Sequence, residues 1–314
     1  MRVKILLFTA VVLWGLLLGG CGGSGKTAFT ARSTGRLNVV ATFYPLCDFT
    51  RKVGGERVAV TCLVPPGVSV HDWEPTPRDV ARVVRADILV YNGAGLEPWI
   101  EQILPEFRGA AVEATQGLTL LRFDAETHGH GDTAGHGAYD PHAWLDPVCA
   151  VHYVERITAA LVEADPAGAE YYRQRAAGYI SQLEELDAAY REAAAAFARR
   201  EIVTSHAAFG YLAARYGLKQ IPVAGLSPQA EPSPARLAEL VRLVREHGVK
   251  YIFFETAASP RLAETLAQEA GVETLVLSPV AGLTPEERAG EKDYIAVMRD
   301  NLAALITALE GEGC

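Results

Sequence analysis

The chain has 314 residues, 49% of them hydrophobic and 21% charged, and a formal net charge of −9 at pH 7. This length exceeds what a single hydrophobic core usually serves, so two domains of ordinary soluble composition are expected. The sequence contains no run of Lys or Arg, which argues against nucleic acid as a partner, whereas an acidic surface mildly favours cations.

Residues 1–20 have the pattern of a secretory signal peptide. Arg2 and Lys4 give a positive start, and the apolar run that follows is too short for a comfortable membrane span. The run ends in LGGC, which resembles a bacterial lipobox and predicts cleavage that leaves Cys21 as a lipid-modified N-terminus. A simple secretory signal followed by a chance cysteine is the alternative. With the lipid, the mature protein would be extracytoplasmic and anchored to the cell membrane.

The first lobe is expected at residues 37–164, after a flexible tether at residues 21–36. Within it, short β-rich runs alternate with helical patterns, and such alternation implies a parallel sheet with crossover helices. The expected strands are LNVVATF, RVAVTCLV, DILVYNG and AAVEAT, and the expected helices are Asp48–Val53, Pro77–Arg85 and Glu97–Phe107.

Residues 165–199 read as one linking helix. The stretch is dominated by Ala, Glu, Arg, Leu and Gln, which are strong helix formers. Pro166 suits a first helical turn, and Asp165 suits the position that caps it. About 33 residues at ~1.5 Å each give a rod of roughly 50 Å. Such a rod would fix the separation of two lobes and limit their closure to small motions.

The second lobe is expected at residues 200–314, where the same alternation recurs. The fold class is therefore α/β, with two lobes that each contain a small, mostly parallel sheet flanked by helices and that are joined by one long rigid helix. The expected strands are EIVTS, KQIPVAG, KYIFFET and ETLVLS, and the expected helices lie near Ala207–Tyr216, Pro234–His247 and Pro260–Ala270.

Five cysteines occur, and none has the CxxC spacing of a zinc knuckle. Cys21 is assigned to the lipid. In an exported protein Cys47 and Cys62 could form a disulfide, and two small buried thiols are an equally open alternative. Cys149 and Cys314 have no evident partner in the sequence pattern.

Three histidines lie in stiff, turn-rich contexts. His71 follows a strand and a Pro-Pro-Gly turn, His142 lies between two prolines in YDPHAWLDP, and His206 follows the strand EIVTS and opens a helix. Ligands of open α/β sheets bind beyond the carboxyl ends of the strands, and His71 and His206 both occupy such positions, so they are expected to face the cleft between the lobes. Three imidazoles that converge there, with His142 as the third, suit Zn²⁺. A lone histidine at a helix N-terminus, such as His206, could instead cap or pack, and His152 and His247 are expected to be surface or packing residues.

Residues 126–138 form a second histidine-containing segment of a different kind. His128, His130 and His136 are separated by glycines, which keep imidazoles open to solvent. The segment could collect metal loosely as an accessory loop. A flexible loop with no role in binding is the alternative.

Several blocks of the sequence resemble one known family, the metal-binding lipoproteins of zinc and manganese ABC importers. The blocks follow in matching order over nearly all of the mature chain: VVATFYPL, PPGVSVHDWEPTPRD, YNGAGLEPW, DPHAWLDP, TSHAAFGYLAARYGL, FETAASPRLAETLAQEAGVETL and YIAVMRDNL. The resemblance implies two lobes joined by a long helix, a metal ion between them, and a membrane permease as partner. The metal-ligand positions of the family match His71, His142 and His206, and a monomer is the default state.

The residue at the third ligand position favours zinc. Manganese-type members tend to carry a carboxylate where His206 stands, and a third imidazole prefers Zn²⁺ to the harder Mn²⁺. The histidine-containing loop points the same way, because zinc members often carry one before the DPH motif. A manganese- or iron-type binding protein of the same family is the alternative.

One departure from the family concerns a fourth ligand. Members usually place an Asp or Glu in a late loop of the second lobe, where this chain has Ser278 and Ala281. The site would then hold three histidines and water, or use another carboxylate. Glu255 is the nearest candidate by topology, and fixing the backbone of its own loop is the alternative role for it.

Two other functions compete with transport. A three-histidine site with a bound water is also the arrangement of zinc hydrolases. Near His71, however, Asp72 fits a role behind the metal ligands and Glu74 fits a turn, so no general base is evident and the expected protein is not an enzyme. A surface adhesin is a third reading, which the sequence does not support independently.

Overall fold

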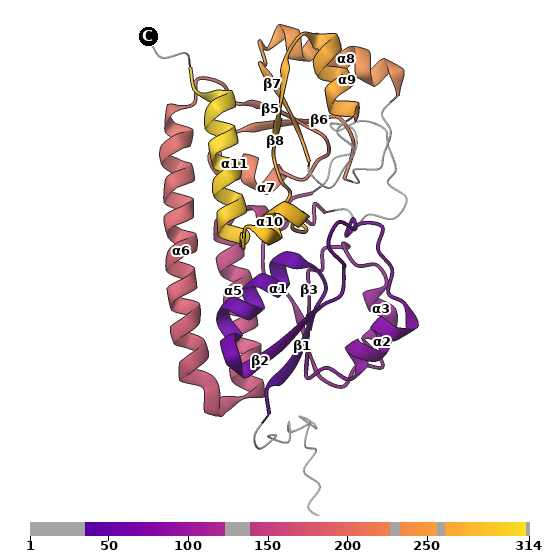
Figure 1. The fold of residues 1–314 in the computed structure, drawn as a ribbon, viewed down its shortest axis with the longest axis vertical. Coiled ribbons are helices and arrows are strands. Elements are labelled where there is room, and N and C mark those ends of the chain that lie inside the picture. Colours follow the sequence, from indigo (N-terminus) through magenta and orange to yellow (C-terminus); the bar gives the residue numbers. More distant parts are fainter. Residues whose placement is uncertain (1–34, 123–138, 227–232, 256–260, 312–314) are drawn as a thin grey trace, which may run out of the picture. The chain divides into compact units, whose positions relative to one another are not determined.

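The computed structural model describes residues 35–122, 139–226, 233–255 and 261–311, which belong to one compact unit (Figure 1). The signal peptide, Cys21 and the loop histidines His128, His130 and His136 lie outside the described residues. Their predicted roles therefore stay predictions.

The first sheet has four parallel strands in the order β2-β1-β3-β4. Because the chain passes from β1 to β2 on one side and then to β3 on the other, the carboxyl ends of β1 and β3 form a topological switch point. The elements are β1 (Leu37–Ala41), α1 (Tyr44–Gly54), β2 (Val58–Cys62), α2 (Pro77–Val84), β3 (Ile88–Tyr91), α3 (Ile100–Ile103) and β4 (Ala110–Glu113).

The second sheet repeats this arrangement with the parallel order β6-β5-β7-β8. Its switch point lies between the carboxyl ends of β5 and β7, where Thr204 pairs with Phe253. The elements are β5 (Glu201–Thr204), α7 (Gly210–Tyr216), β6 (Lys219–Pro222), α8 (Pro234–Glu246), β7 (Tyr251–Phe254), α9 (Arg261–Ala270), β8 (Glu273–Val276) and α10 (Pro285–Ala289).

Three long helices complete the fold: α5 (Pro147–Ala164), α6 (Ala169–Ala196) and α11 (Tyr294–Leu309). Buried tyrosines tie α6 to helices that follow strands of different sheets. Tyr179 Oη donates to Asp48 Oδ2 of α1 at 3.3 Å, and Tyr190 Oη donates to the Met298 carbonyl of α11 at 2.7 Å. Both rings are at most 3% exposed, so α6 is packed into the core along its length rather than standing free.

The predicted fold class is confirmed, with strands at all eight expected places and a long helix after residue 165. Asp165 accepts a hydrogen bond from Gly168 N at 3.2 Å and so caps a 3-10 turn, and the α-helix itself begins at Ala169. The sequence analysis did not predict α11. The lobe boundaries given above remain a prediction.

Two predicted helices were wrong in extent. The helix expected over Glu97–Phe107 is reduced to Ile100–Ile103, because the carboxylate of Glu97 bonds to the backbone of the preceding turn and Pro105 ends the segment. His206 does not open a helix. Residues 205–207 form bends instead, and α7 begins only at Gly210.

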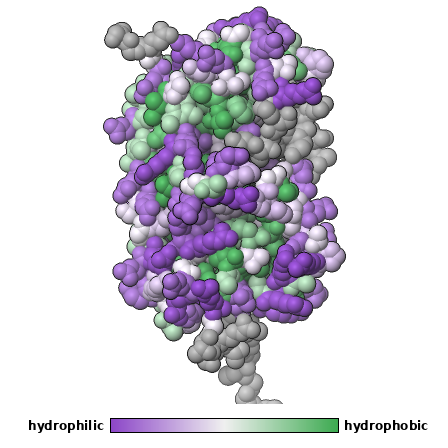
Figure 2. Space-filling view, in the orientation of Figure 1, coloured by the Kyte–Doolittle hydropathy of each residue, from purple (hydrophilic) through white to green (hydrophobic). Residues whose placement is uncertain are grey.

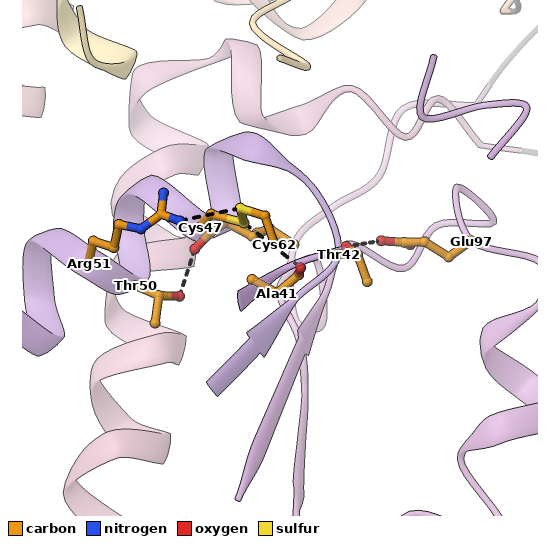
Figure 3. The surroundings of a disulfide bond; sticks show 8 residues. Ala41, Thr42, Cys47, Thr50, Arg51, Cys62 and Glu97 are labelled. Atoms are coloured by element: carbon orange, nitrogen blue, oxygen red, sulfur yellow. Dashed lines mark hydrogen bonds between the residues drawn. A yellow bond between two sulfur atoms is a disulfide. The ribbon is translucent and has the colours of Figure 1, made fainter. Parts of the chain in front are cut away.

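The two alternatives for Cys47 and Cys62 are resolved in favour of a disulfide, which joins α1 to the end of β2 (Figure 3). The Cα atoms lie 5.9 Å apart, and Cys47 is fully buried. Cys149 is a free, buried thiol. A disulfide of this kind agrees with folding in an oxidising compartment.

Hydrophobic and hydrophilic residues alternate over the face drawn in Figure 2, where apolar groups are small and scattered. The large hydrophobic side chains that are clearly exposed lie apart from one another in the sequence: Val68, Val84, Tyr139, Val148 and Val276. Within the described ranges, every helix is too short or too polar to cross a membrane.

Candidate metal centre

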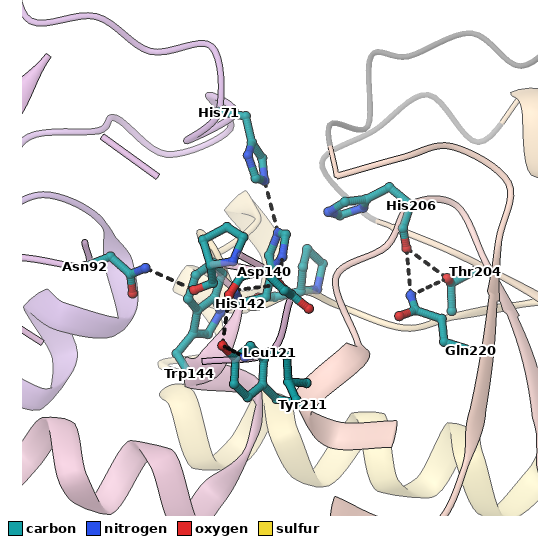
Figure 4. Close-up of polar contacts among 12 residues, drawn as sticks. His71, Asn92, Leu121, Asp140, His142, Trp144, Thr204, His206, Tyr211 and Gln220 are labelled. Atoms are coloured by element: carbon teal, nitrogen blue, oxygen red, sulfur yellow. Dashed lines mark hydrogen bonds and ion pairs between the residues drawn. The ribbon is translucent and has the colours of Figure 1, made fainter. Parts of the chain in front are cut away.

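The structure brings His71, His142 and His206 together, although they are distant in the sequence (Figure 4). One ring nitrogen of each lies within 4.8 Å of the others, and the Nε2 atoms of His71 and His142 are 3.1 Å apart. Tetrahedral zinc with Zn–N bonds of about 2.0–2.1 Å would hold its nitrogens roughly 3.3 Å apart. The three nitrogens therefore converge at nearly the spacing that one ion requires.

His206 lies two residues beyond the carboxyl end of β5 and is 2% exposed. Its carbonyl accepts hydrogen bonds from Thr204 Oγ1 at 2.8 Å and from Gln220 Nε2 at 2.9 Å, which fix the bend after the strand. Its Nε2 atom is buried and has no hydrogen-bond partner within the described part of the chain. A buried nitrogen left unpaired costs about 1–3 kcal/mol, so Nε2 is the His206 atom best placed to bind a metal ion.

Glu255 supplies the partner of the other His206 nitrogen. It follows β7 directly, and β7 pairs with β5, so the sheet places this carboxylate beside the ring. Glu255 Oε1 accepts a hydrogen bond from His206 Nδ1, and the side chain is 3% exposed. This bond to a histidine ring is a role that the sequence analysis did not consider for Glu255. A carboxylate on Nδ1 fixes the tautomer in which Nε2 carries the lone pair.

His142 has an equivalent partner in Asp140, two residues earlier. Asp140 Oδ1 lies 2.7 Å from His142 Nδ1 and also accepts from the His142 backbone N–H at 2.9 Å. Tyr211 Oη donates to the Asp140 carbonyl at 2.9 Å, which ties this loop to α7 (Figure 4). The sequence analysis missed Asp140. Its signal was the D-x-H spacing within YDPHAWLDP, which lets one carboxylate reach both the backbone and the ring of the histidine.

His71 comes from the loop between β2 and α2 and is the least buried of the three histidines. Its backbone N–H donates to Ser69 Oγ at 3.3 Å. The loop ends at α2, whose first turn is held by a reciprocal capping box between Thr76 and Asp79. Asp72, expected behind the ligands, has an exposed side chain.

All three histidines line a cavity of about 190 Å³. The family resemblance suggested a fourth carboxylate at Ser278 or Ala281, and these two residues have different surroundings. Ala281 lines this cavity, while the buried Ser278 Oγ accepts a hydrogen bond from Val280 N at 3.1 Å. Val280 has a φ of 53°, an uncommon conformation for a β-branched residue, and such backbone persists where surrounding contacts enforce it. Trp144 Nε1 adds such a contact by donating to the Pro279 carbonyl at 2.8 Å.

The donor set fits a divalent cation of borderline softness. Three imidazoles offer nitrogen, and the two carboxylates behind them carry the charge that would balance a dication in a buried site. An anion at the same place would face two carboxylates without compensation. The chemistry of the site is therefore that of a Zn²⁺ centre with room for one further ligand.

Comparison with known proteins agrees with this geometry. Residues 39–308 match the model of the family described as "ZnuA: Zinc-uptake complex component A periplasmic". The chain is 42% identical over 300 residues to the high-affinity zinc uptake system protein ZnuA of Bacillus subtilis, which covers 94% of each chain. It is also 42% identical over 288 residues to the zinc-binding lipoprotein AdcA of Streptococcus pneumoniae, and these cover 90% of this chain but only 58% of AdcA.

Solved structures give the same result. The Zn(II)-bound ZnuA-like domain of S. pneumoniae AdcA matches with a TM-score of 0.77 and 41% identity, covering 88% of this chain and 100% of that domain. Family model, relatives and fold thus agree over almost the whole described chain. The chain belongs to the ZnuA family, the periplasmic A components of zinc-uptake complexes.

Proposed function

We propose that this protein captures Zn²⁺ outside the cell membrane and delivers it to the permease of an ABC importer. The observation that carries the proposal is the convergence of His71, His142 and His206, whose ligand nitrogens lie within 4.8 Å of one another. Relatives named as a zinc uptake protein and as a zinc-binding lipoprotein support it. Zinc is the cargo of this protein and is not altered by it.

Zinc is favoured over manganese by the ligand atoms. The proposed ligands are three nitrogens, and a nitrogen donor at His206 suits Zn²⁺ better than Mn²⁺, which prefers oxygen. The carboxylates of Asp140 and Glu255 hydrogen-bond to ring nitrogens, so their bonded oxygens are directed at the histidines. The fourth position would then be taken by water in the cavity beside Ala281.

A hydrolase, the alternative from another class, would need a general base within hydrogen-bond reach of a metal-bound water. In the described cavity wall, the carboxylate of Glu255 already accepts from His206, and Glu286 is exposed. Assaying the zinc-loaded protein for ester and peptide hydrolysis separates the two functions. Turnover that disappears in His142→Ala would overturn the transport proposal.

The proposal includes attachment to the membrane through a lipid on Cys21 and action as a monomer on the periplasmic side or cell surface. Mass analysis of the mature N-terminus checks the lipid directly. In Cys21→Ala the protein is expected to leave the membrane fraction. A variant that remains in that fraction would contradict anchoring through Cys21.

The direct test measures metal bound to purified protein and its affinity by chelator competition. In His142→Ala, loss of a ligand is expected to lower zinc affinity by more than the 10–100-fold typical of residues behind the ligands. The matched control is His152→Ala. His152 is partly exposed and lies 2.9 Å from the Gln116 carbonyl, so this change should leave affinity within twofold. Equal zinc content in both variants would refute the assignment.

A further inference from the structure

A second buried carboxylate lies at the carboxyl ends of the strands of the first sheet. Glu97 is 4% exposed, and its two oxygens accept three hydrogen bonds. Oε1 accepts from Thr42 Oγ1 at 2.6 Å (Figure 3) and from Asn92 N at 2.9 Å. Oε2 accepts from Gly93 N at 3.1 Å. The residues that donate to Oε1 directly follow β1 and β3, so Glu97 occupies the topological switch point of this sheet.

The two sheets use their switch points differently. In the second sheet the corresponding place presents His206 and Glu255 to the cavity. In the first sheet the same place is filled from within by Glu97, and no residue of this corner lines the described cavity. Among the described residues, the first sheet therefore contributes His71 from the loop after β2 but no lining residue from its switch point.

Asn92 connects this switch point to the loop of His142. Its side-chain Nδ2 donates to the Pro141 carbonyl at 2.9 Å (Figure 4). Its Oδ1 accepts from Tyr153 Oη at 2.7 Å. Pro141 lies between Asp140, whose carboxylate holds the ring, and His142 itself. Asn92 is fully buried, so its hydrogen bond to this carbonyl does not compete with bulk water.

The backbone around Asn92 needs external support. Gly93, Ala94 and Gly95 all have positive φ angles of 82°, 52° and 81°, and for Ala94 this conformation costs roughly 1–2 kcal/mol. The hydrogen bonds that Glu97 accepts from Asn92 N and Gly93 N hold the first peptide units of this turn. Burial raises the pKa of the Glu97 carboxyl to about 7 despite its donors, so stability alone is a weak reason to place a carboxyl here.

We propose that Asn92 and Glu97 are positioning residues of the metal site, which hold the Pro141 carbonyl and thereby aim the Asp140–His142 pair at the ion. Glu97 holds the turn that contains Asn92, and the Asn92 amide in turn holds the loop of His142 through its hydrogen bond to the Pro141 carbonyl. The inference deepens the proposed zinc function and depends on it for its effect on binding. Its effect on the His142 ring is independent of metal.

The test compares two variants of the same hydrogen-bond network. Asn92→Asp keeps the acceptor for Tyr153 but replaces the donor to Pro141 with an oxygen that repels the carbonyl. Tyr153→Phe removes the hydrogen bond that Asn92 Oδ1 accepts and leaves the donor to Pro141 intact. The two changes therefore disturb one buried corner, and only the first breaks the link to His142.

Three measurements are made on each full-length mature variant: zinc affinity by chelator competition, the d–d absorption of the Co²⁺-loaded protein, and the His142 ring signals in metal-free NMR spectra. Asn92→Asp is expected to lower zinc affinity about tenfold, to alter the cobalt spectrum, and to shift the His142 signals. Tyr153→Phe is expected to lower thermal stability while leaving affinity within twofold. If Asn92→Asp does not fold, Asn92→Ala takes its place with the same expectation.

Glu97→Gln is expected to lower zinc affinity as Asn92→Asp does, but by a smaller factor. The glutamine amide keeps one oxygen acceptor but places its NH₂ donor opposite the N–H of Gly93. Unchanged His142 signals in the Asn92 variant, or equal loss of affinity in Tyr153→Phe, would overturn the inference. Parent protein that binds no zinc, with shifted His142 signals in Asn92→Asp, would instead overturn the proposed function and leave the positioning role standing.

Discussion

Removing the carboxylate of Glu255 is expected to weaken zinc binding without removing a ligand. In Glu255→Ala, His206 Nδ1 loses an acceptor inside a site where the side chains are 2–3% exposed. Hydrogen bonds to charged groups contribute about 1.5–3 kcal/mol, and at ~1.4 kcal/mol per tenfold this corresponds to a loss of roughly 10–150-fold in affinity. Losses of about 10–100-fold are usual for residues that orient metal ligands, so two independent routes give the same range.

The matched control is Glu286→Ala. Glu286 also lines the cavity, but its side chain is exposed. Because solvent screens exposed charges, their interactions usually contribute less than about 1 kcal/mol. Chelator competition at pH 7.5 measures both variants, with Glu255→Gln as an intermediate that keeps an acceptor but no charge. Affinity of Glu255→Ala within threefold of the parent, or an equal loss in Glu286→Ala, would refute the role assigned to Glu255.

Four further predictions concern selectivity, pH and stability. His206→Glu should raise the affinity for Mn²⁺ relative to Zn²⁺, and unchanged selectivity in competition binding would contradict this reading. Zinc affinity should fall as the pH is lowered, because protons compete with the metal for imidazole nitrogens, so a flat titration from pH 7.5 to pH 5 would argue against histidine ligation. Burial raises the pKa of Asp48 to about 6 from 3.8, which means that ionising it destabilises the fold as pH rises through this window. Relative to the parent, Asp48→Asn should therefore gain up to about 3 kcal/mol in unfolding free energy between pH 4 and pH 7, and a pH-independent difference in denaturant titrations would contradict that. Replacing Cys47 and Cys62 together by Ala should lower stability by about 3 kcal/mol, given their separation of 15 residues, and leave zinc affinity unchanged. A fall in zinc affinity together with stability would contradict this, because it would mean that the disulfide also shapes the metal site.

The sequence predicted those parts of the fold that depend on local pattern. Each of the eight strands is a short β-rich run between turn residues, so its place was visible without tertiary information. The three histidines were found for a similar reason, because each follows a turn or strand end where α/β proteins bind ligands. Ala281, one of the two places where the family resemblance suggested a fourth carboxylate, lines the cavity.

What the sequence could not reveal depends on which strands are neighbours. Glu255 reaches His206 because β7 lies beside β5, although β6 comes between them in the chain. Asn92 reaches Pro141 across 49 residues through one side-chain amide. Glu97 has the spacing of a helical residue, yet its carboxylate is taken up by the turn before α3. The first two are tertiary hydrogen bonds, which a local pattern does not reveal, and in the third a side-chain bond to the preceding turn outweighs the helical spacing.

The unequal burial of the three histidines has a consequence for how the ion leaves. His142 and His206 are 1% and 2% exposed and each is braced by a carboxylate, whereas His71 is only partly buried and comes from a surface loop. With zinc bound as proposed, we therefore expect His71 to be the first ligand to detach. The residence time of the ion would then depend on the loop that carries His71, and the metal selectivity on the two buried histidines.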